Sequence, residues 1–354
     1  MSTQFVRLNF FQKVWHKLWK QIGRRGTFAE RANELQSRRS EVEAFFGKST
    51  AVNQYIDSVQ RFYRWRSLLG KDIIQFLPIF QPGGCKLFAQ HVGVDLKKEI
   101  HSTSEAWIFD GIKLPHPRNK SDKRMFGGEL LDIVFPSYFK HRFENFDRYC
   151  ATVGNLLGDF SDGPYEYENV FLKEGDVVFD CGANIGLFSA VASRYGCQVF
   201  SFEAIPDIID NYLSKTANMN GNIRALNFAV WDKEETLNFS LVVNSIGSSR
   251  HDHLLREKDV QMKRKQFAVP AIPLDAFVEK NGIERVDFIK ADIEGAERNM
   301  LNGARRILKE FAPKLSICTY HLPDDPQVLR EIILDANPKY EIVEKFSKMY
   351  AYVP

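Results

Sequence analysis

Two carboxylates and a glycine-containing loop lie where apolar runs in the middle of the chain end. Asp180 ends one run, and the sequence continues through Gly182, Asn184 and Gly186 into a helix-like segment, while Glu203 ends the next run. Glycine lets the backbone approach a ligand closely, and a carboxylate at a second strand end can accept both hydrogen bonds of a ribose diol. The pattern predicts a site for an adenosine group.

The spacing of the loop distinguishes between kinds of adenosine ligand. A pyrophosphate cradle uses the pattern GxGxxG. Residues 180–186 read D-x-G-A-N-x-G instead, with Asn184 where the second glycine should approach phosphate. We therefore expect a ligand without phosphates, such as adenosine carrying an amino-acid tail. The alternative is a nicotinamide-dependent oxidoreductase.

A second group of polar residues follows two later apolar runs. The segment "KADIEGAE" supplies Asp292, Glu294 and Glu297, and "TYH" ends in His321. A histidine titrates near neutral pH and can take a proton from a hydroxyl. We expect His321 to be the base, Asp292 or Glu294 to orient it or bind substrate, and Glu297 to favour a helix start. In the alternative interpretation Asp292, Glu294 and His321 together hold a divalent cation.

These residues require a parallel sheet whose strands end at one edge. Strands are expected at 176–180, 198–203, 224–230, 286–290, 314–320, 340–346 and 349–353, and helices at 186–195, 206–218, 295–311 and 325–336. Most of the strands are continuous apolar runs, which indicates a sheet covered on both faces. The last two strands are separated only by Ser347 and Lys348, so they must pair antiparallel. The insert 232–283 contains hairpin-like segments at 236–243 and 266–272.

Composition limits the class of protein. Of the 354 residues, 44% are hydrophobic and 26% are charged, as in ordinary globular proteins. The net charge of +3 is too small to predict a nucleic-acid partner, and we expect none. No apolar run approaches the roughly 20 residues that span a bilayer. Five scattered cysteines without a CxxC motif predict reduced thiols and a cytoplasmic location.

Residues 1–150 are predicted to form a mainly helical module of unknown role, and residues 151–354 the catalytic domain. Residues 1–40 carry nine Lys and Arg against two Glu. The basic, aromatic segment 5–25 leaves three interpretations open. The segment packs as a helix on the catalytic domain, binds peripherally to an anionic membrane surface, or binds a polyanionic partner.

Six segments in succession resemble a known family. They are "GPYEYENVFLKEGDVVFDCGANIGLFSA" (163–190), "FSFEAIP" around Glu203, "LNFAV" (226–230), "IPLDAF" (272–277), "VDFIKADIEGAE" (286–297) and "PKLSICTYH" (313–321). Their order and spacing resemble the motifs of the FkbM-type methyltransferase family over about residues 160–354. Where that family commonly has Phe-Glu-Pro, this chain has Phe-Glu-Ala with its proline delayed to Pro206, but the carboxylate remains.

The resemblance implies a fold, a cofactor and a reaction. The fold is α/β, with a Rossmann-like class I methyltransferase sheet, mostly parallel and ending in an antiparallel hairpin, and with a mainly helical N-terminal extension. The candidates for binding S-adenosylmethionine are Asp180, Gly182, Ala183, Asn184, Gly186 and Glu203, to which "LNFAV" adds Asn227 and Ala229. We expect methyl transfer to a hydroxyl of a small molecule, sugar or glycan. The rival interpretation is a catalytically silent scaffold that still binds the cofactor.

Overall fold

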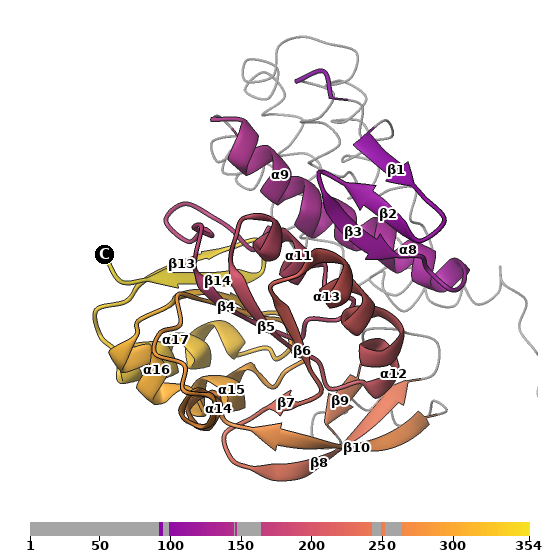
Figure 1. Ribbon diagram of the computed structural model, residues 1–354. Helices are drawn as coiled ribbons and strands as arrows, with labels where there is room; N and C mark the ends of the chain where they lie inside the picture. The colour runs from indigo at the N-terminus through magenta and orange to yellow at the C-terminus, as the bar shows by residue number, and fades with distance from the viewer. Residues whose placement is uncertain (1–91, 95–98, 145, 147–163, 243–248, 252–263) are drawn as a thin grey trace, which may run out of the picture. The chain divides into compact units, whose positions relative to one another are not determined.

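A computed structural model shows how these elements are arranged (Figure 1). It describes residues 92–94, 99–144, 146, 164–242, 249–251 and 264–354. The basic segment 5–25 and most of the predicted helical extension lie outside the described residues. Residues 96–147 group with residues 161–354 in one compact unit. The predicted division into residues 1–150 and 151–354 stays a prediction.

The central sheet has seven strands. They are β4 (Val177–Cys181), β5 (Gln198–Phe202), β6 (Ile223–Leu226), β11 (Phe288–Ala291), β12 (Lys314–Cys318), β13 (Glu341–Lys345) and β14 (Lys348–Tyr352). Their order is β13-β14-β12-β11-β4-β5-β6, and only the pairs that include β14 are antiparallel. The turn before β14 uses Phe346 and Ser347, both with positive φ, so the hairpin loop lies one residue earlier than expected. The predicted sheet with its terminal hairpin is confirmed.

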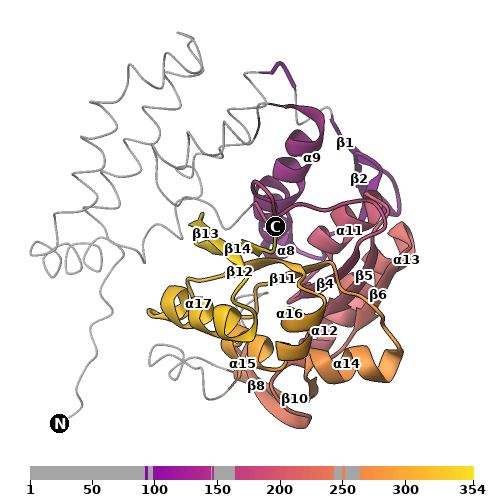
Figure 2. The same cartoon turned by 90° about the vertical axis from the view of Figure 1, so that its left-hand side faces the viewer.

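Helices cover both faces of this sheet, as Figure 2 shows. One set is α11 (Leu187–Arg194), α12 (Pro206–Ile208), the π-helix η3 (Ile209–Leu213) and α13 (Ser214–Asn220); the other is α14 (Leu274–Asn281), α15 (Glu297–Asn302), α16 (Arg305–Glu310) and α17 (Asp325–Ala336). Helices α14 to α17 share one apolar core with the sheet. The predicted helix 295–311 is divided at Gly303, where a Cβ would lie 2.1 Å from the backbone oxygen of Trp231.

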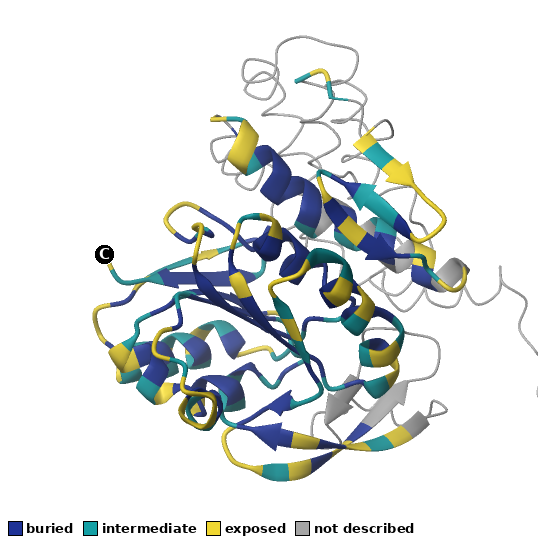
Figure 3. Ribbon diagram, in the orientation of Figure 1, coloured by how far each residue is buried: buried dark blue, intermediate teal, exposed yellow. Residues whose placement is uncertain are grey.

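The central strands are buried along their length (Figure 3), yet the sheet face towards α11 is not wholly apolar. A row of polar side chains crosses four neighbouring strands in register: Ser201, Asp180, Lys290 and Ser316. All four are buried. Lys290 is paired with Asp180, and Ser201 is linked to Asp180 through Ser189 of α11. The buried hydroxyl of Ser316 has no hydrogen-bond partner among the described residues.

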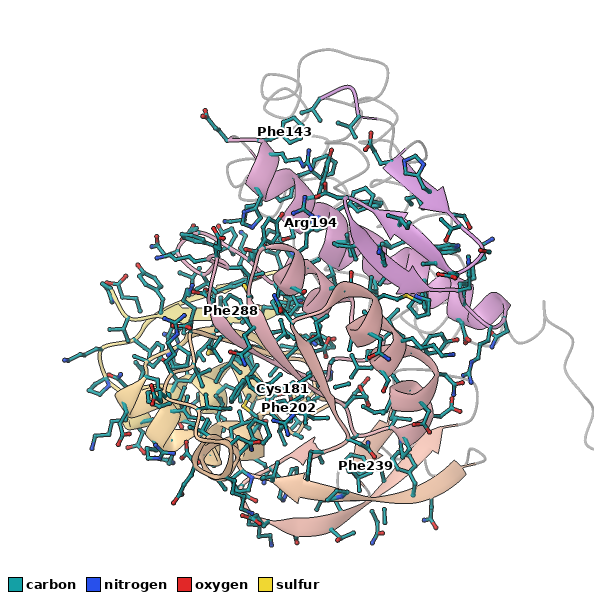
Figure 4. All side chains as sticks on the ribbon, viewed as in Figure 1. Phe143, Cys181, Arg194, Phe202, Phe239 and Phe288 are labelled. Carbon is teal, nitrogen blue, oxygen red and sulfur yellow. The ribbon has the colours of Figure 1, made fainter. Side chains whose placement is uncertain are left out.

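A second sheet packs beside the carboxyl edge of the first. It contains β7 (Ala229–Val230), β8 (Glu235–Val242), β9 (Ser249–His251) and β10 (Arg264–Ile272), in the order β7-β10-β8-β9. Strands β8 and β10 pair antiparallel over eight residues of register, which confirms the expected hairpin-like pair. Phe239 of β8, labelled in Figure 4, belongs to the small apolar core of this sheet with Trp231 and Val269.

The segment before the central sheet is not purely helical. It forms β1 (Ile100–Ser102), β2 (Ala106–Phe109) and β3 (Ile112–Pro115), then α8 (Lys120–Glu129), the π-helix η2 (Leu130–Val134) and α9 (Phe135–Arg142). The strands form one antiparallel sheet, which the mainly helical prediction missed. The signal was the dipeptide Asp110–Gly111, whose positive φ angles make the tight turn between β2 and β3. None of the helices in the described residues has both the length and the apolar character to cross a membrane.

Candidate active site

The loop after β4 is shaped by close backbone approach. Gly182 has φ 73° and passes so near the 291–293 segment that a Cβ would lie 2.0 Å from the backbone oxygen of Asp292. The backbone N–H groups of Gly182 and Ala183 both donate to the Phe202 oxygen at 2.9 Å. Asn184 takes a left-handed conformation with φ 50°. Only glycine fits at position 182, so the loop geometry follows directly from the sequence.

Glu203 is tied to this loop by backbone donors. Its Oε2 accepts the N–H of Asn184 at 2.9 Å and its Oε1 accepts the N–H of Ile205 at 2.8 Å. Burial raises the pKa of this carboxyl, and the two N–H groups oppose that rise only in part. Each oxygen keeps a second lone pair, so the carboxylate can still accept hydrogen bonds from a diol.

A cavity of about 290 Å³ opens at this edge. Its walls come from the segments that follow β4, β5, β6 and β11, including Gly182, Ala183, Asn184, Glu203, Ala229, Lys290, Asp292 and Glu294. Phe228 and Trp231 give it an apolar side, and Glu129 of α8 closes it from the segment before the sheet. The cavity therefore joins the predicted adenosine site to two of the predicted catalytic carboxylates.

Three of the predicted cofactor-binding residues do not line this cavity. Asp180 is fully buried beneath it. Gly186, with φ 84°, begins α11 where a Cβ would lie 2.8 Å from Leu213, so its role here is close helix packing. The Asn227 side chain donates to the backbone oxygen of Glu203 at 2.9 Å. These three residues shape the site from outside the cavity wall.

Asp180 forms a buried ion pair that the sequence analysis did not identify. Lys290 is its register partner on β11, and its Nζ lies 3.0 Å from Asp180 Oδ1. Ser189 of α11 donates to Oδ2 at 2.6 Å. The Lys290 ammonium also donates to the Gly182 oxygen at 2.6 Å. Burial lowers the pKa of Lys290, but the attraction of Asp180 outweighs this and raises it, so Lys290 is a fixed cation under the loop.

Asp292 contacts several side chains at the cavity wall. Tyr165 donates to its Oδ2 at 2.9 Å, and Tyr320 lies 3.2 Å from Oδ1 and 3.3 Å from Oδ2. Burial raises the pKa of Asp292, but the positive charges of Lys290 and His321 nearby more than compensate, and the pKa is lowered. Asp292 is therefore ionised at neutral pH and faces the cavity.

His321 lies behind Asp292 rather than in the cavity wall. Its side chain is 2% exposed, its Nδ1 lies 3.0 Å from Glu297 Oε1, and its Nε2 lies 3.5 Å from Asp292 Oδ1. Burial lowers its pKa, but the pair with Glu297 raises it to about 9. Since a histidine that keeps its proton at neutral pH cannot accept another, these contacts do not favour the predicted role of His321 as the base.

Asp292, Glu297 and His321 place potential metal-ligand atoms within 4.8 Å of one another. However, the Glu297 oxygens already accept the backbone N–H groups of Ile293 and Gly295, at 2.9 and 3.0 Å. A protonated histidine is not a metal ligand. The contacts show instead that Glu297 organises the loop that carries Asp292. This cluster differs from the predicted cation ligands, Asp292, Glu294 and His321, by having Glu297 in place of Glu294.

The sequence analysis missed four residues of the cavity wall that have ionisable side chains: Glu129, Tyr165, Lys290 and Tyr320. Of these, Lys290 had a visible signal, because a lysine inside the apolar run "DFIKA" must find a buried partner. Glu129 had none, since its contact with Asn184 Nδ2, at 2.6 Å, joins segments far apart in the sequence.

The fold and this site define a class of protein. A mostly parallel seven-stranded sheet with a terminal antiparallel hairpin, and an adenosine cradle without a phosphate loop, are those of a Rossmann-like S-adenosylmethionine-dependent methyltransferase. Residues 180–353 match the Methyltransferase FkbM domain. The chain carries an FkbM-type methyltransferase domain, which confirms the predicted family resemblance and the predicted cofactor, S-adenosylmethionine.

Two relatives are similar over part of the chain. Hexuronic acid methyltransferase AglP of Haloferax volcanii is 24% identical over 172 residues, which cover 49% of this chain and 67% of the relative. Methyltransferase sdnD of Sordaria araneosa is 28% identical over 172 residues, covering 41% of this chain and 65% of the relative. The matches thus span about two thirds of each relative. The crystal structure of methyltransferase FkbM from Methylobacillus flagellatus has a TM-score of 0.41 at 18% identity, covering 85% of this chain and 71% of that one.

Proposed function

We propose that the protein is an O-methyltransferase that transfers the methyl group of S-adenosylmethionine to a hydroxyl of a sugar, glycan or natural-product acceptor. One observation carries the proposal: Asp292 and Glu294 line the same cavity as Gly182 and Glu203. Carboxylates able to accept a hydroxyl proton therefore lie in the same cavity as the residues that we propose to bind adenosine. The relative described as a hexuronic acid methyltransferase supports a sugar acceptor.

The chain's residues fit the cofactor. S-adenosylmethionine supplies a methyl group on a positively charged sulfur. Glu203 would accept the ribose hydroxyls, and Gly182 and Ala183 offer a backbone surface without bulky side chains. Ala229 and Phe228 border the apolar part of the cavity, where an adenine ring fits. Asp180, Gly186 and Asn227 support this arrangement from below.

Asp292 is the residue that we propose to receive the proton of the acceptor hydroxyl, with Glu294 binding a neighbouring polar group. Asp292 is ionised, faces the cavity and is held by two tyrosine hydroxyls. A weak base suffices to remove the proton as the oxygen–methyl bond forms, because alignment supplies most of the rate. His321 then acts through Asp292 and Glu297 and is a positioning residue.

The direct test is methyl transfer from isotopically labelled S-adenosylmethionine to a panel of acceptors. The panel should contain neutral methyl glycosides, methyl glycosides of uronic acids, and simple polyols. We expect labelled product with at least one sugar, and a rate lower by about a hundredfold or more with Asp292→Asn. A protein that binds S-adenosylmethionine by calorimetry but labels no hydroxyl compound would support the scaffold interpretation instead.

A further inference from the structure

Tyr165 lies at the base of the cavity and is fixed on several sides. It is 5% exposed, its hydroxyl donates to Asp292 Oδ2 at 2.9 Å, and Phe188 packs against its ring at 5.4 Å between centroids. The ammonium groups of Lys290 and Lys348 lie 5.1 and 4.6 Å from the ring centroid. Two cations near one aromatic ring restrict its position, because each is attracted to the ring's π-electrons. The ring is therefore held with its hydroxyl directed at one carboxylate oxygen.

Lys348 has an unusual environment for a lysine. It is the first residue of β14, opposite Cys318 of β12, and is fully buried. Among the described residues its Nζ has no hydrogen-bond partner. Burying an ammonium without a hydrogen-bond partner is costly, and the Tyr165 ring, 4.6 Å away, offsets part of this cost. Its positive charge acts on Asp292, whose pKa it helps to lower.

We propose that Tyr165 and Lys348 are positioning residues for Asp292: Tyr165 fixes one carboxylate oxygen, and Lys348, 4.6 Å from the Tyr165 ring centroid, places a positive charge beside that ring. The proposal rests on the role proposed above for Asp292. Tyr165 precedes the segment 180–353 that matches the family domain, and Lys348 reaches the site from the carboxyl-terminal hairpin. The two proposed positioning residues thus come from opposite ends of the segment 164–354.

The groups that face Asp292 come from several elements. The cations are Lys290 of β11, His321 after β12 and Lys348 of β14. The hydroxyls belong to Tyr165 and Tyr320, and the buried thiol is that of Cys318 in β12. The acidic neighbours are Glu294 and Glu297. Removing one cation or one hydroxyl donor leaves the others in place. Each single variant should therefore shift the titration of Asp292 upwards without abolishing it.

The first measurement needs no acceptor. In the full chain with S-adenosylhomocysteine added, ¹³C NMR of labelled aspartate carboxyl carbons follows the titration, and Asp292→Asn identifies the signal. We expect Tyr165→Phe and Lys348→Met each to raise the midpoint by about one pH unit. Lys348→Arg keeps the charge and should restore the wild-type midpoint. Tyr165→Phe removes only one oxygen atom and should fold. It therefore still tests the titration of Asp292 if the Lys348→Met protein does not fold.

The matched control is Tyr340→Phe. Tyr340 is also a buried tyrosine, and its hydroxyl donates to the Pro313 oxygen at 2.8 Å, outside the cavity wall. This variant should leave the Asp292 midpoint unchanged. If the midpoint moves with neither Tyr165→Phe nor Lys348→Met, the proposal is overturned; if it moves with one, the other residue loses its assigned role.

The second measurement is kinetic, with a methyl glycoside that the acceptor panel shows to be methylated. Tyr165→Phe should lower kcat about tenfold while the KM for S-adenosylmethionine changes less than about twofold, because the hydroxyl acts on the base and not on the cofactor. A raised KM with an unchanged kcat would contradict this. If the wild-type protein methylates nothing, the proposed function fails, whereas the NMR titration still decides the roles of Tyr165 and Lys348.

Discussion

The two ends of the cavity are built in different ways. At the adenosine end, the loop 182–186 and Glu203 are joined by backbone hydrogen bonds, and the shape depends on residues that permit a positive φ. At the reactive end, Asp292 is surrounded by side chains that carry charge, from β11, β14 and the segment after β12. The first end is defined by backbone geometry and the second by buried electrostatics.

This difference has a consequence for substitutions. A site built from closely packed backbone fails when a side chain is added. The backbone atoms are already in direct contact, so the new side-chain atoms would overlap with them. A charge network instead adjusts its protonation when one member is lost, because the remaining charges still act. We therefore expect changes at the adenosine end to remove cofactor binding, and changes at the reactive end to alter rate and pH dependence while the cofactor still binds.

Gly182→Ala should have the largest effect. The new Cβ would lie 2.0 Å from the Asp292 backbone oxygen, and the positive φ adds strain, so the loop must move. We expect the affinity for S-adenosylmethionine to fall by more than about a hundredfold, measured by calorimetry. The control is Gly127→Ala in α8, where a Cβ meets nothing within 4 Å. Equal affinity in both variants would show that the loop is not the cradle.

Asp292→Asn should separate rate from binding at the other end. The amide keeps the shape of the side chain but cannot receive the hydroxyl proton, so we expect kcat to fall by about a hundredfold or more. The affinity for S-adenosylmethionine should change by less than about threefold. Glu294→Gln is the comparison, with a smaller loss of kcat and a higher KM for the acceptor. A variant at position 292 with wild-type turnover would remove Asp292 as the base.

The same contrast explains what could be predicted from sequence. The strands, the terminal hairpin and the loop 180–186 were predictable because apolar runs, turn residues and glycine spacing act locally. Glu203 was predictable because strand ends meet at one edge of a parallel sheet. The three-stranded sheet β1–β3 was missed although Asp110–Gly111 signalled its turn.

The ion network could not be predicted in the same way. Identifying His321 at a strand end was possible, but its protonation depends on Glu297, and that contact appears only when α15 and the segment after β12 are packed together. Likewise, Lys348 was expected in a turn, and only the register of β14 shows that it is buried. Side-chain charge therefore depends on tertiary contacts that sequence spacing does not specify.

His321→Gln tests the charge network at the reactive end of the cavity through its effect on the free energy of unfolding. The folded-state pKa of His321 is raised from 6.5 to about 9, so its contribution to stability is fully present below pH 6.5 and is lost as pH rises through about 9. The shift corresponds to at most about 3 kcal/mol in the free energy of unfolding. Urea unfolding at a series of pH values should show the wild-type protein losing stability over this range and the variant losing less. His101→Gln, at an exposed position, is the control.

Glu203→Gln should have the smallest effect, because the amide keeps one acceptor oxygen and most of the backbone cradle. We expect the affinity for S-adenosylmethionine to fall about tenfold, or about 1.4 kcal/mol, with kcat at saturation nearly unchanged. Burial raises the pKa of Glu203 above its ordinary value of 4.5, so wild-type affinity should begin to decline at a higher pH on acidification than for an exposed glutamate. The variant has no carboxyl to protonate there and should lack this decline. An equal decline in both proteins would place the titrating group elsewhere, and a large loss of kcat in the variant would show that the two ends are not separable.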